Sequence, residues 1–345
     1  MLRALWRRLS GSTKPHDAGS RASDTPSGPV KVAAPAVAVV QPTDTPLQQQ
    51  AAFHPFQQSA DRLFTARLLG VGELRPGEAG AAERLVIQRL TALGREGDDP
   101  NLVPRLPVVL PRLLGLVRRD DVSPRELVER LSDDPTLVGE VVRVANSPRY
   151  RIARDVEDLH EAVLMLGQRG LVQIVVSAAM RPIFDTRRGR FSHIAGMTPW
   201  DLTQRCSHAC ADLCDQDADR FQAFLSGMGA NVGLIAALRV LDSIYTEPRA
   251  PDTEGFHDAL SIAASRLSGR IARQWGFTRA VCQAIERRGD PHAGMSEDRF
   301  TRTLSVADRI SKWHVLNPGF PAASLTGLSE PDRRCYLELE RAFSR

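Results

Sequence analysis

Two helix-start signals follow one another between residues 123 and 135, and they constrain the fold of this chain more than any other feature. In the first, Ser123 is the predicted N-cap, Pro124 the first helical residue and Glu126 the reciprocal partner of a capping box. Apolar residues then recur at helical spacing at Leu127, Val128 and Leu131. This pattern predicts a short amphipathic helix that begins at a defined residue.

The second signal repeats the first a few residues later. Asp134 is the predicted cap and Pro135 the first helical residue. The predicted buried face consists of Leu137, Val138, Val141, Val142 and Ala145. Pro148 disfavours a helical conformation for the residue before it, so the helix should end at Asn146-Ser147. Two helices this close together predict a compact helical domain.

Helical patterns continue along the rest of the chain, and strand-like alternation is nearly absent. We expect a helix at 158–167, with Asp158 and Glu161 as a capping box and Gly167 at its end, and another from 198 onwards, with Thr198 as its cap. Further helices are expected at 171–180, 219–241, 256–275, 279–288, 297–313 and 331–343, with a loop at 183–197. In the predicted helix 219–241, the glycines Gly227, Gly229 and Gly233 would allow neighbouring helices to approach closely. The predicted fold class is therefore all-α, a compact multi-helix domain.

Several motifs within this region resemble the HDOD family, a group of bacterial signalling domains related to HD-type metal phosphohydrolases. They are Val103–Leu116, the Ser-Asp-Asp-Pro-Thr-Leu segment at 132–137, Val-Ala-Asn-Ser at 144–147, Glu161–Gly167, Trp200, Phe224–Leu238, Trp275 and Ala284-Ile285. The resemblance spans roughly residues 100–290 and implies an HD-like helical fold.

The resemblance also implies where the metal ligands of an HD phosphohydrolase would lie. The adjacent His-Asp pair would correspond to Ala230 and Asn231, and a further His to Leu202. A methyl group cannot bind a metal ion, and an amide is a weak, uncharged ligand. Such an enzyme needs its metal to supply hydroxide and to polarise the phosphoryl group.

The last part of the implied site is equally altered. The expected His pair falls near Arg288 and Gly289, with His292 close by, and Asp308 resembles the final carboxylate. A cation at that point would repel a metal ion, and one carboxylate cannot hold a catalytic metal. We therefore assign no catalytic, cofactor-binding or metal-binding residue and expect no enzymatic activity.

The resemblance implies a non-catalytic signalling or regulatory role, exerted on a protein partner or a small ligand. Asn146, Ser147 and Tyr150 are candidate contacts, although helix termination explains the first two better. Arg187, Arg188 and Arg190 are also candidates, although a solvated loop is the better explanation. The alternative is an active HD-type phosphohydrolase acting on a nucleotide, with Asp308, His257, His292 and Asp290 as its ligands.

The distribution of charge along the chain bears on whether it binds nucleic acid. The chain has 45 basic and 41 acidic residues, and four of the basic ones, Arg3, Arg7, Arg8 and Lys14, lie within the first fourteen residues. The remainder is formally neutral, which argues against a broad nucleic-acid surface. The short basic segment at the N-terminus is expected to be a frayed end without stable structure. Weak contact with an anionic membrane surface is the alternative.

The five cysteines are Cys206, Cys210, Cys214, Cys282 and Cys335. The first three recur every four residues, and His208 lies between them. This spacing would allow some of these side chains to bind a metal ion, but it favours a face of a helix that is buried in the core. Their odd number, without a secretory signal or transmembrane segment, indicates a reducing cytosol, so the expected location is cytoplasmic.

Four regions are expected along the chain. Residues 1–52 should be a disordered basic terminus and linker, and 53–98 a helical segment with apolar spacing at Leu63, Leu68, Leu85, Val86, Leu90 and Leu93. Residues 99–294 should form the HDOD-like domain, and 295–345 helices that pack on it.

Overall fold

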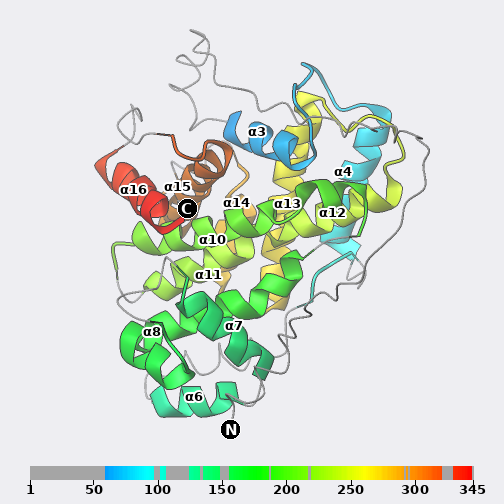
Figure 1. Cartoon of the computed structure of the whole chain (residues 1–345). Coiled ribbons are helices and arrows are strands. Elements are labelled where there is room, and N and C mark those ends of the chain that lie inside the picture. The colour runs from blue at the N-terminus through cyan, green and yellow to red at the C-terminus, as the bar shows by residue number, and fades with distance from the viewer. Residues whose placement is uncertain are drawn as a thin grey trace, which may run out of the picture. The chain divides into compact units, whose positions relative to one another are not determined.

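The computed structural model describes residues 59–96, 102–105, 124–132, 135–147, 155–185, 188–216, 219–290, 293, 296–320 and 329–343. Its regular elements are α-helices and one short 3₁₀ helix, and within the described residues no strand forms beyond an isolated bridge between Arg75 and Thr253 (Figure 1). The all-α prediction is confirmed. The predicted disordered segment 1–52 lies outside the described residues.

Helices α6 (Pro124–Ser132), α7 (Pro135–Ala145) and α8 (Leu159–Met180) pack against one another. Both α6 and α7 begin at the predicted proline, while their capping residues Ser123 and Asp134 lie outside the described residues. Of the predicted buried face of α7, Val141 and Ala145 are buried, whereas Val138 and Val142 are half-buried.

Helix α8 begins with the predicted cap and bends at the predicted glycine. The Asp158 carboxylate accepts a hydrogen bond from the backbone N–H of Glu161 at 2.8 Å, and the Glu161 carboxylate accepts one from the N–H of Glu157. Gly167 has φ +69°, a left-handed conformation that glycine adopts without steric cost. The two predicted helices at 158–167 and 171–180 are thus joined through a kink.

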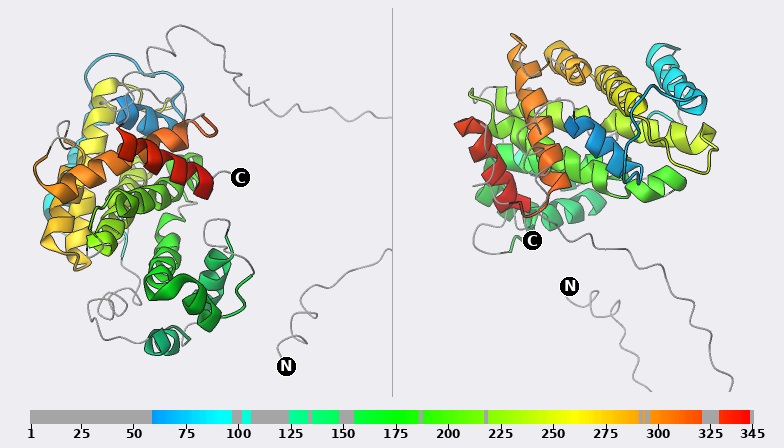
Figure 2. Two further views of the ribbon diagram at one scale, coloured as in Figure 1. Left: turned by 90° about the vertical axis from the view of Figure 1, so that its left-hand side faces the viewer. Right: turned by 90° about the horizontal axis from the view of Figure 1, so that it is seen from above.

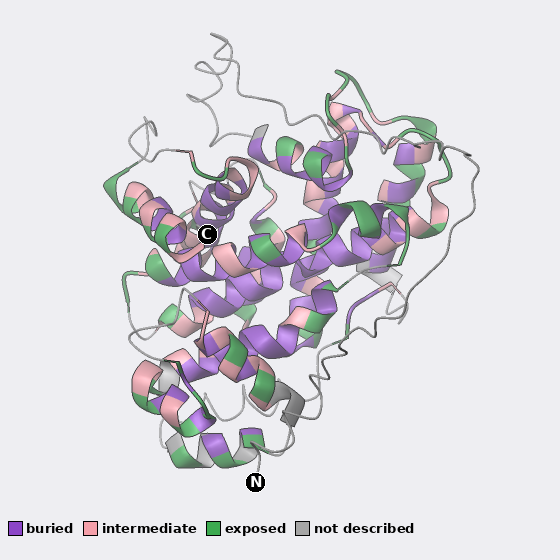
Figure 3. Cartoon of the chain, viewed as in Figure 1, coloured by how far each residue is buried: buried purple, intermediate pink, exposed green. Residues whose placement is uncertain are grey.

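The rest of the described chain forms α10 (Thr198–Asp212), which is the predicted Cys-containing helix, α13 (Glu254–Gln274) and further helices. They are α3 (Ser59–Leu68), α4 (Ala81–Glu96), the 3₁₀ helix η1 (Arg181–Phe184), α9 (Arg190–Ala195), α11 (Arg220–Ala230), α12 (Val232–Ile244), α14 (Arg279–Arg287), α15 (Arg299–Leu316) and α16 (Glu330–Phe343). Helix α10 packs on α11 and α15, whereas α13 packs on α3, α4, α12 and α14 (Figure 2). Buried residues concentrate on α10, α11 and α12 (Figure 3).

Close approach between these helices depends on two glycines. A Cβ on Gly227 would lie 2.4 Å from Ser207 Cα, and a Cβ on Gly233 would lie 2.1 Å from the Ala264 carbonyl oxygen. Backbone atoms cannot move aside as flexible side chains do. The prediction that these glycines bring helices close together is confirmed.

The predicted single helix 219–241 is wrong, because it breaks at Asn231 into α11 and α12. Asn231 has φ −105° and ψ 5°, outside the helical region. Together, Arg220–Ile244 is the one stretch among the described residues that is long and apolar enough to cross a membrane, and 94% of its most apolar window is buried in protein.

The predicted loop 183–197 begins within η1 and contains α9, so it is partly helical. Helix α10 begins at Thr198 with Met197, rather than Thr198, as its N-cap. Helix α9 is formed with help from a distant residue. The Asp242 carboxylate accepts from the backbone N–H of Phe191 at 2.6 Å and of Ser192 at 3.1 Å. No pattern near residue 190 could reveal this cap.

The helical pattern expected between residues 53 and 98 forms α3 and α4, but not all of its apolar residues are buried. Leu63 and Leu85 are about half exposed, at 48% and 53%, whereas Phe64 and Val86 are buried. A step of one residue turns a side chain by about 100° on a helix. Packing against α13 therefore selected the neighbouring apolar residue in each helix.

Candidate functional site

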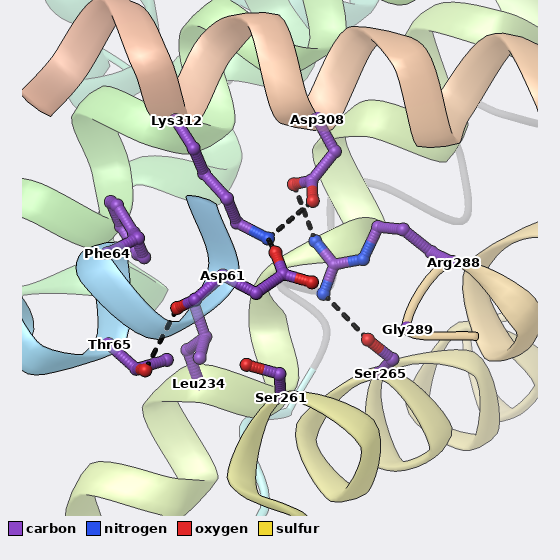
Figure 4. Close-up of a pocket in the computed structure, with 10 residues that line it drawn as sticks. All are labelled: Asp61, Phe64, Thr65, Leu234, Ser261, Ser265, Arg288, Gly289, Asp308 and Lys312. Carbon is purple, nitrogen blue, oxygen red and sulfur yellow. Dashed lines mark hydrogen bonds and ion pairs between the residues drawn. The ribbon is translucent and has the colours of Figure 1, made fainter. Parts of the chain in front are cut away.

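Charged side chains from α3, α15 and the end of α14 meet in the interior, beside the break between α11 and α12. We call Asp61, Arg288, Asp308 and Lys312 the ion cluster (Figure 4). Asp308 and Lys312 are four residues apart on α15, which places both on one face of that helix. The site thus combines residues separated by up to 251 positions in the sequence.

Arg288 is the central donor of the ion cluster. One terminal nitrogen donates to Asn231 Oδ1 at 2.6 Å and to Asp308 Oδ1 at 2.8 Å, and the other donates to Ser265 Oγ at 3.0 Å. The side chain of Arg288 is only 4% exposed. The residue therefore joins the helix break at Asn231 to α13 and α15.

Lys312 completes the cluster from the side of α3. Its ammonium donates to Asp308 Oδ2 and to Asp61 Oδ1, both at 2.5 Å. Two cations thus face two carboxylates, and the formal charge of the cluster is zero. Such mutual pairing is what makes buried charges tolerable.

Burial and ion pairing act on these groups in opposite directions. Burial lowers the pKa of Lys312, but the carboxylates of Asp308 and Asp61 outweigh it, so the pKa of Lys312 is raised. Burial raises the pKa of Asp308, and Arg288 together with Lys312 reverses this, so the pKa of Asp308 is lowered. Asp308 and Lys312 are therefore expected to stay charged near neutral pH.

A small cavity of about 10 Å³ lies beside the ion cluster. It is lined by Asp61, Phe64, Thr65, Leu234, Ser261, Ser265, Arg288, Gly289, Asp308 and Lys312 (Figure 4). This volume is comparable with the space that one water molecule needs. No larger ligand fits while α3 is in place.

The residues at this position do not fit a catalytic metal ion. Asp308 already accepts from two cationic side chains, Ala230 and Leu202 are buried apolar residues, and Asn231 accepts from Arg288. Among the described residues, no group of three or more His, Cys, Asp or Glu side chains could hold a metal ion. Of the residues named from the family resemblance, Asn231, Arg288 and Asp308 do meet, but as an ion network.

Among the residues that the structure describes, the ligands of the alternative hypothesis do not form a metal site. His257 is buried and contacts Thr65 Oγ1 at 2.9 Å through Nδ1 and the Pro251 carbonyl at 3.1 Å through Nε2. Since a carbonyl can only accept, Nε2 carries the proton and the ring is held in place. Asp290 is exposed, and His292 lies outside the described residues.

The other candidate contacts have local structural roles. The Asn146 amide donates to the Val156 carbonyl at 2.8 Å and its oxygen accepts from the Val156 N–H at 2.7 Å, which closes the end of α7. Arg190 donates to the carbonyls of Glu247 and Pro248. Ser147 is half-buried and Arg188 is exposed, while Tyr150 and Arg187 lie outside the described residues.

Cys206 and Cys210 are fully buried on α10, and Cys214 is half-buried. Burial raises the pKa of the Cys210 thiol, which keeps it protonated. The His208 ring contacts the rings of Phe224 and Phe343. These positions agree with the predicted core face.

Sequence reasoning missed Lys312, Asp61 and Ser265. The spacing of Asp308 and Lys312 is a detectable signal, since opposite charges four residues apart on a helix can pair. Nothing in the sequence near Asp61 or Ser265 connects them to residues far along the chain, because only helix packing brings them together.

The chain is similar to a known protein family and to several solved structures. The sequence model of the HDOD domain family matches residues 103–291. A solved Shewanella amazonensis structure, described provisionally as a metal-dependent phosphohydrolase, is 18% identical with a TM-score of 0.54, over 77% of this chain and 100% of that one. An HDOD domain protein of unknown function from Geobacter sulfurreducens is 17% identical with a TM-score of 0.53, over 75% and 89%.

Among curated proteins, an uncharacterised protein of Treponema pallidum (strain Nichols) is 21% identical over 217 residues, which is 60% of this chain. The match spans 41% of that protein's length. At these identities, the similarity to the two solved structures establishes the fold alone.

Proposed function

Because the chain belongs to the HDOD family, we propose that it is a non-catalytic regulatory module of a bacterial signalling pathway. In this proposal it acts by binding a protein partner or a small ligand, and it does not hydrolyse a phosphate ester. The family assignment rests on a match that covers more than half of the chain, residues 103–291.

The observation that carries the proposal is the position of Arg288. Its guanidinium lies 2.8 Å from Asp308, the one carboxylate that resembles a metal ligand of the related phosphohydrolases. The Lys312 ammonium occupies the other oxygen of the same carboxylate. A metal ion would have to displace both cations from a buried site, and it would then have few charged ligands. Metal-assisted hydrolysis requires several ligands and an open coordination position.

The test is a hydrolysis assay on the full chain with Mn²⁺, Fe²⁺ or Mg²⁺ and bis(4-nitrophenyl) phosphate as a general phosphodiester substrate. The matched variant is Asp308→Asn, which preserves the shape of the side chain and removes its charge. We expect both proteins to release nitrophenol at the same background rate, with circular dichroism confirming that both are folded.

The proposal would be overturned if the wild-type chain hydrolysed the substrate in a metal-dependent reaction and folded Asp308→Asn protein did not. The chain would then be a phosphohydrolase. Elemental analysis of protein purified without chelator provides an independent measurement. We expect no transition metal or Mg²⁺ close to one ion per chain.

A further inference from the structure

We propose that the cavity beside Lys312 is a binding site for a small oxyanion, a phosphate or carboxylate group, and that helix α3 occupies this site in cis through the carboxylate of Asp61. The proposal rests on the regulatory function above, because it identifies the ligand chemistry and the moving element of the same site.

The cavity is built from two separable parts. Asp61, Phe64 and Thr65 reach it from α3, and every other lining residue comes from residues 234–312 (Figure 4). Helix α3 lies outside the segment 103–291 that matches the family. It therefore forms one wall of the site and is not part of the segment that defines the family.

Moving α3 would change the charge of the site. With α3 in place, Asp61 and Asp308 balance Arg288 and Lys312. Without α3, two cations would face the carboxylate of Asp308 alone, so the site would carry one net positive charge. Without Asp61, Arg288 and Lys312 have one carboxylate between them, and an anionic ligand would restore the charge balance of the site.

Hydrogen-bond donors are also in excess around the ion cluster. Arg288 Nε, Asn231 Nδ2 and Ser261 Oγ are buried and donate to no other protein group. Buried donors in proteins are usually satisfied, so a group of three calls for an explanation. The oxygen atoms of a phosphate or carboxylate are acceptors, and they match this excess.

Helix α3 is held in place by buried apolar side chains, among them Phe64 and Leu68, and by ion pairs to α13. On the side away from the cavity, Arg62 pairs with Asp258 at 2.6 Å and with Glu254 at 3.1 Å. After the helix, Leu69 is still buried in the core, Gly70 adopts φ +73° and Val71 packs on the core before Arg75 binds Asp252. A hinge at the exposed residues Gly72 and Glu73 would therefore move α3 together with Leu69 and Val71, and the loop that Arg75 anchors would stay in place.

Occupancy of the site and the position of α3 should be coupled. The cavity of about 10 Å³ is too small for phosphate while α3 is docked. Because Phe64 and Leu68 are buried, α3 stays docked in the free protein. A bound oxyanion would replace Asp61 and release α3, which is a change that a signalling partner could detect.

Two variants test the proposal by different routes. Asp61→Asn removes the resident carboxylate, whereas Asp258→Asn weakens the attachment of α3 and leaves every charge of the ion cluster unchanged. The matched control is Glu286→Gln, which breaks the ion pair with Arg273 between α13 and α14. Binding of inorganic phosphate to each full-length protein is measured by titration calorimetry at constant ionic strength, against chloride.

We expect phosphate to bind Asp61→Asn and Asp258→Asn on the order of tenfold more tightly than the wild type, because the binding-competent state is more populated. Glu286→Gln should bind like the wild type, and adding Lys312→Met to Asp258→Asn should abolish the gain. Hydrogen exchange of residues 59–68 should become faster when phosphate is added. Acetate in a second titration shows whether the site accepts a carboxylate as well.

Equal phosphate affinities for folded wild-type, Asp61→Asn and Asp258→Asn proteins would overturn the proposal, as would slower exchange of α3 with phosphate. Neither result bears on catalysis, which the phosphodiester assay measures separately. Failure of the oxyanion site can thus be distinguished from failure of the proposed regulatory function.

Discussion

The Arg288 guanidinium and the Asp308 carboxylate form an ion pair at 2.8 Å in which the two side chains are only 4% and 3% exposed. In an ion pair this deeply buried, each charge compensates the cost of removing the other from water, so the loss of either partner leaves an uncompensated buried charge. Its contribution to stability is directly testable by removing one partner.

Replacing Arg288 with Met should destabilise the protein by about 3–5 kcal/mol, because Asp308 would lose its partner in the interior. Urea unfolding followed by circular dichroism measures the change. The control is Arg287→Met, one residue earlier on an exposed position, which should stay within about 0.5 kcal/mol of the wild type. Equal unfolding midpoints for the two variants would show that the buried pair has been assigned wrongly.

Replacing Gly233 with Ala should cost about 1–3 kcal/mol, because the added Cβ would overlap the Ala264 carbonyl and push α12 away from α13. Gly139 on α7 offers a contrast, since no heavy atom lies within 4 Å of the position that a Cβ would take there. Gly139→Ala should stabilise the protein by about 0.5–1 kcal/mol through helix propensity alone. Chemical denaturation of both variants should therefore show opposite signs.

Replacing Asn146 with Ala should cost about 1–3 kcal/mol, since the Val156 N–H and carbonyl would both lose their partner. Ser147→Ala, at the adjacent half-buried position, should change stability by less than about 0.5 kcal/mol. Thermal unfolding of the two variants decides between helix termination and ligand contact as the role of Asn146. An Asn146→Ala protein of wild-type stability would count against the structural role.

Stability should fall as the pH drops through about 6.5, the ordinary pKa of histidine. Burial lowers the pKa of His257 below this ordinary value, so the unfolded chain takes up a proton in this range that the folded chain does not. Burial lowers the pKa of His314 as well. Unfolding free energies measured between about pH 7.5 and pH 5.5 should decrease less for His257→Gln than for the wild type. A steeper decrease in the variant would contradict the assigned neutral state.

The sequence by itself determined the elements whose causes are local. Proline and capping residues act within one helical turn, which is why the starts of α6 and α7 and the cap of α8 at Asp158 were predictable. That alanine and asparagine, and not a His-Asp pair, stand at positions 230 and 231 was likewise visible, because it depends on residue identity alone.

Only the tertiary structure decided what depends on contacts between distant segments. The break at Asn231 coincides with its hydrogen bond from Arg288, and α9 is capped by Asp242, which lies 51 residues beyond Phe191. Lys312 reaches Asp61 only because α3 packs on α15. Periodicity and capping describe interactions within about four residues, whereas charge compensation in a core is set by whichever helices meet there. The ion cluster could therefore be found only once the helices were packed.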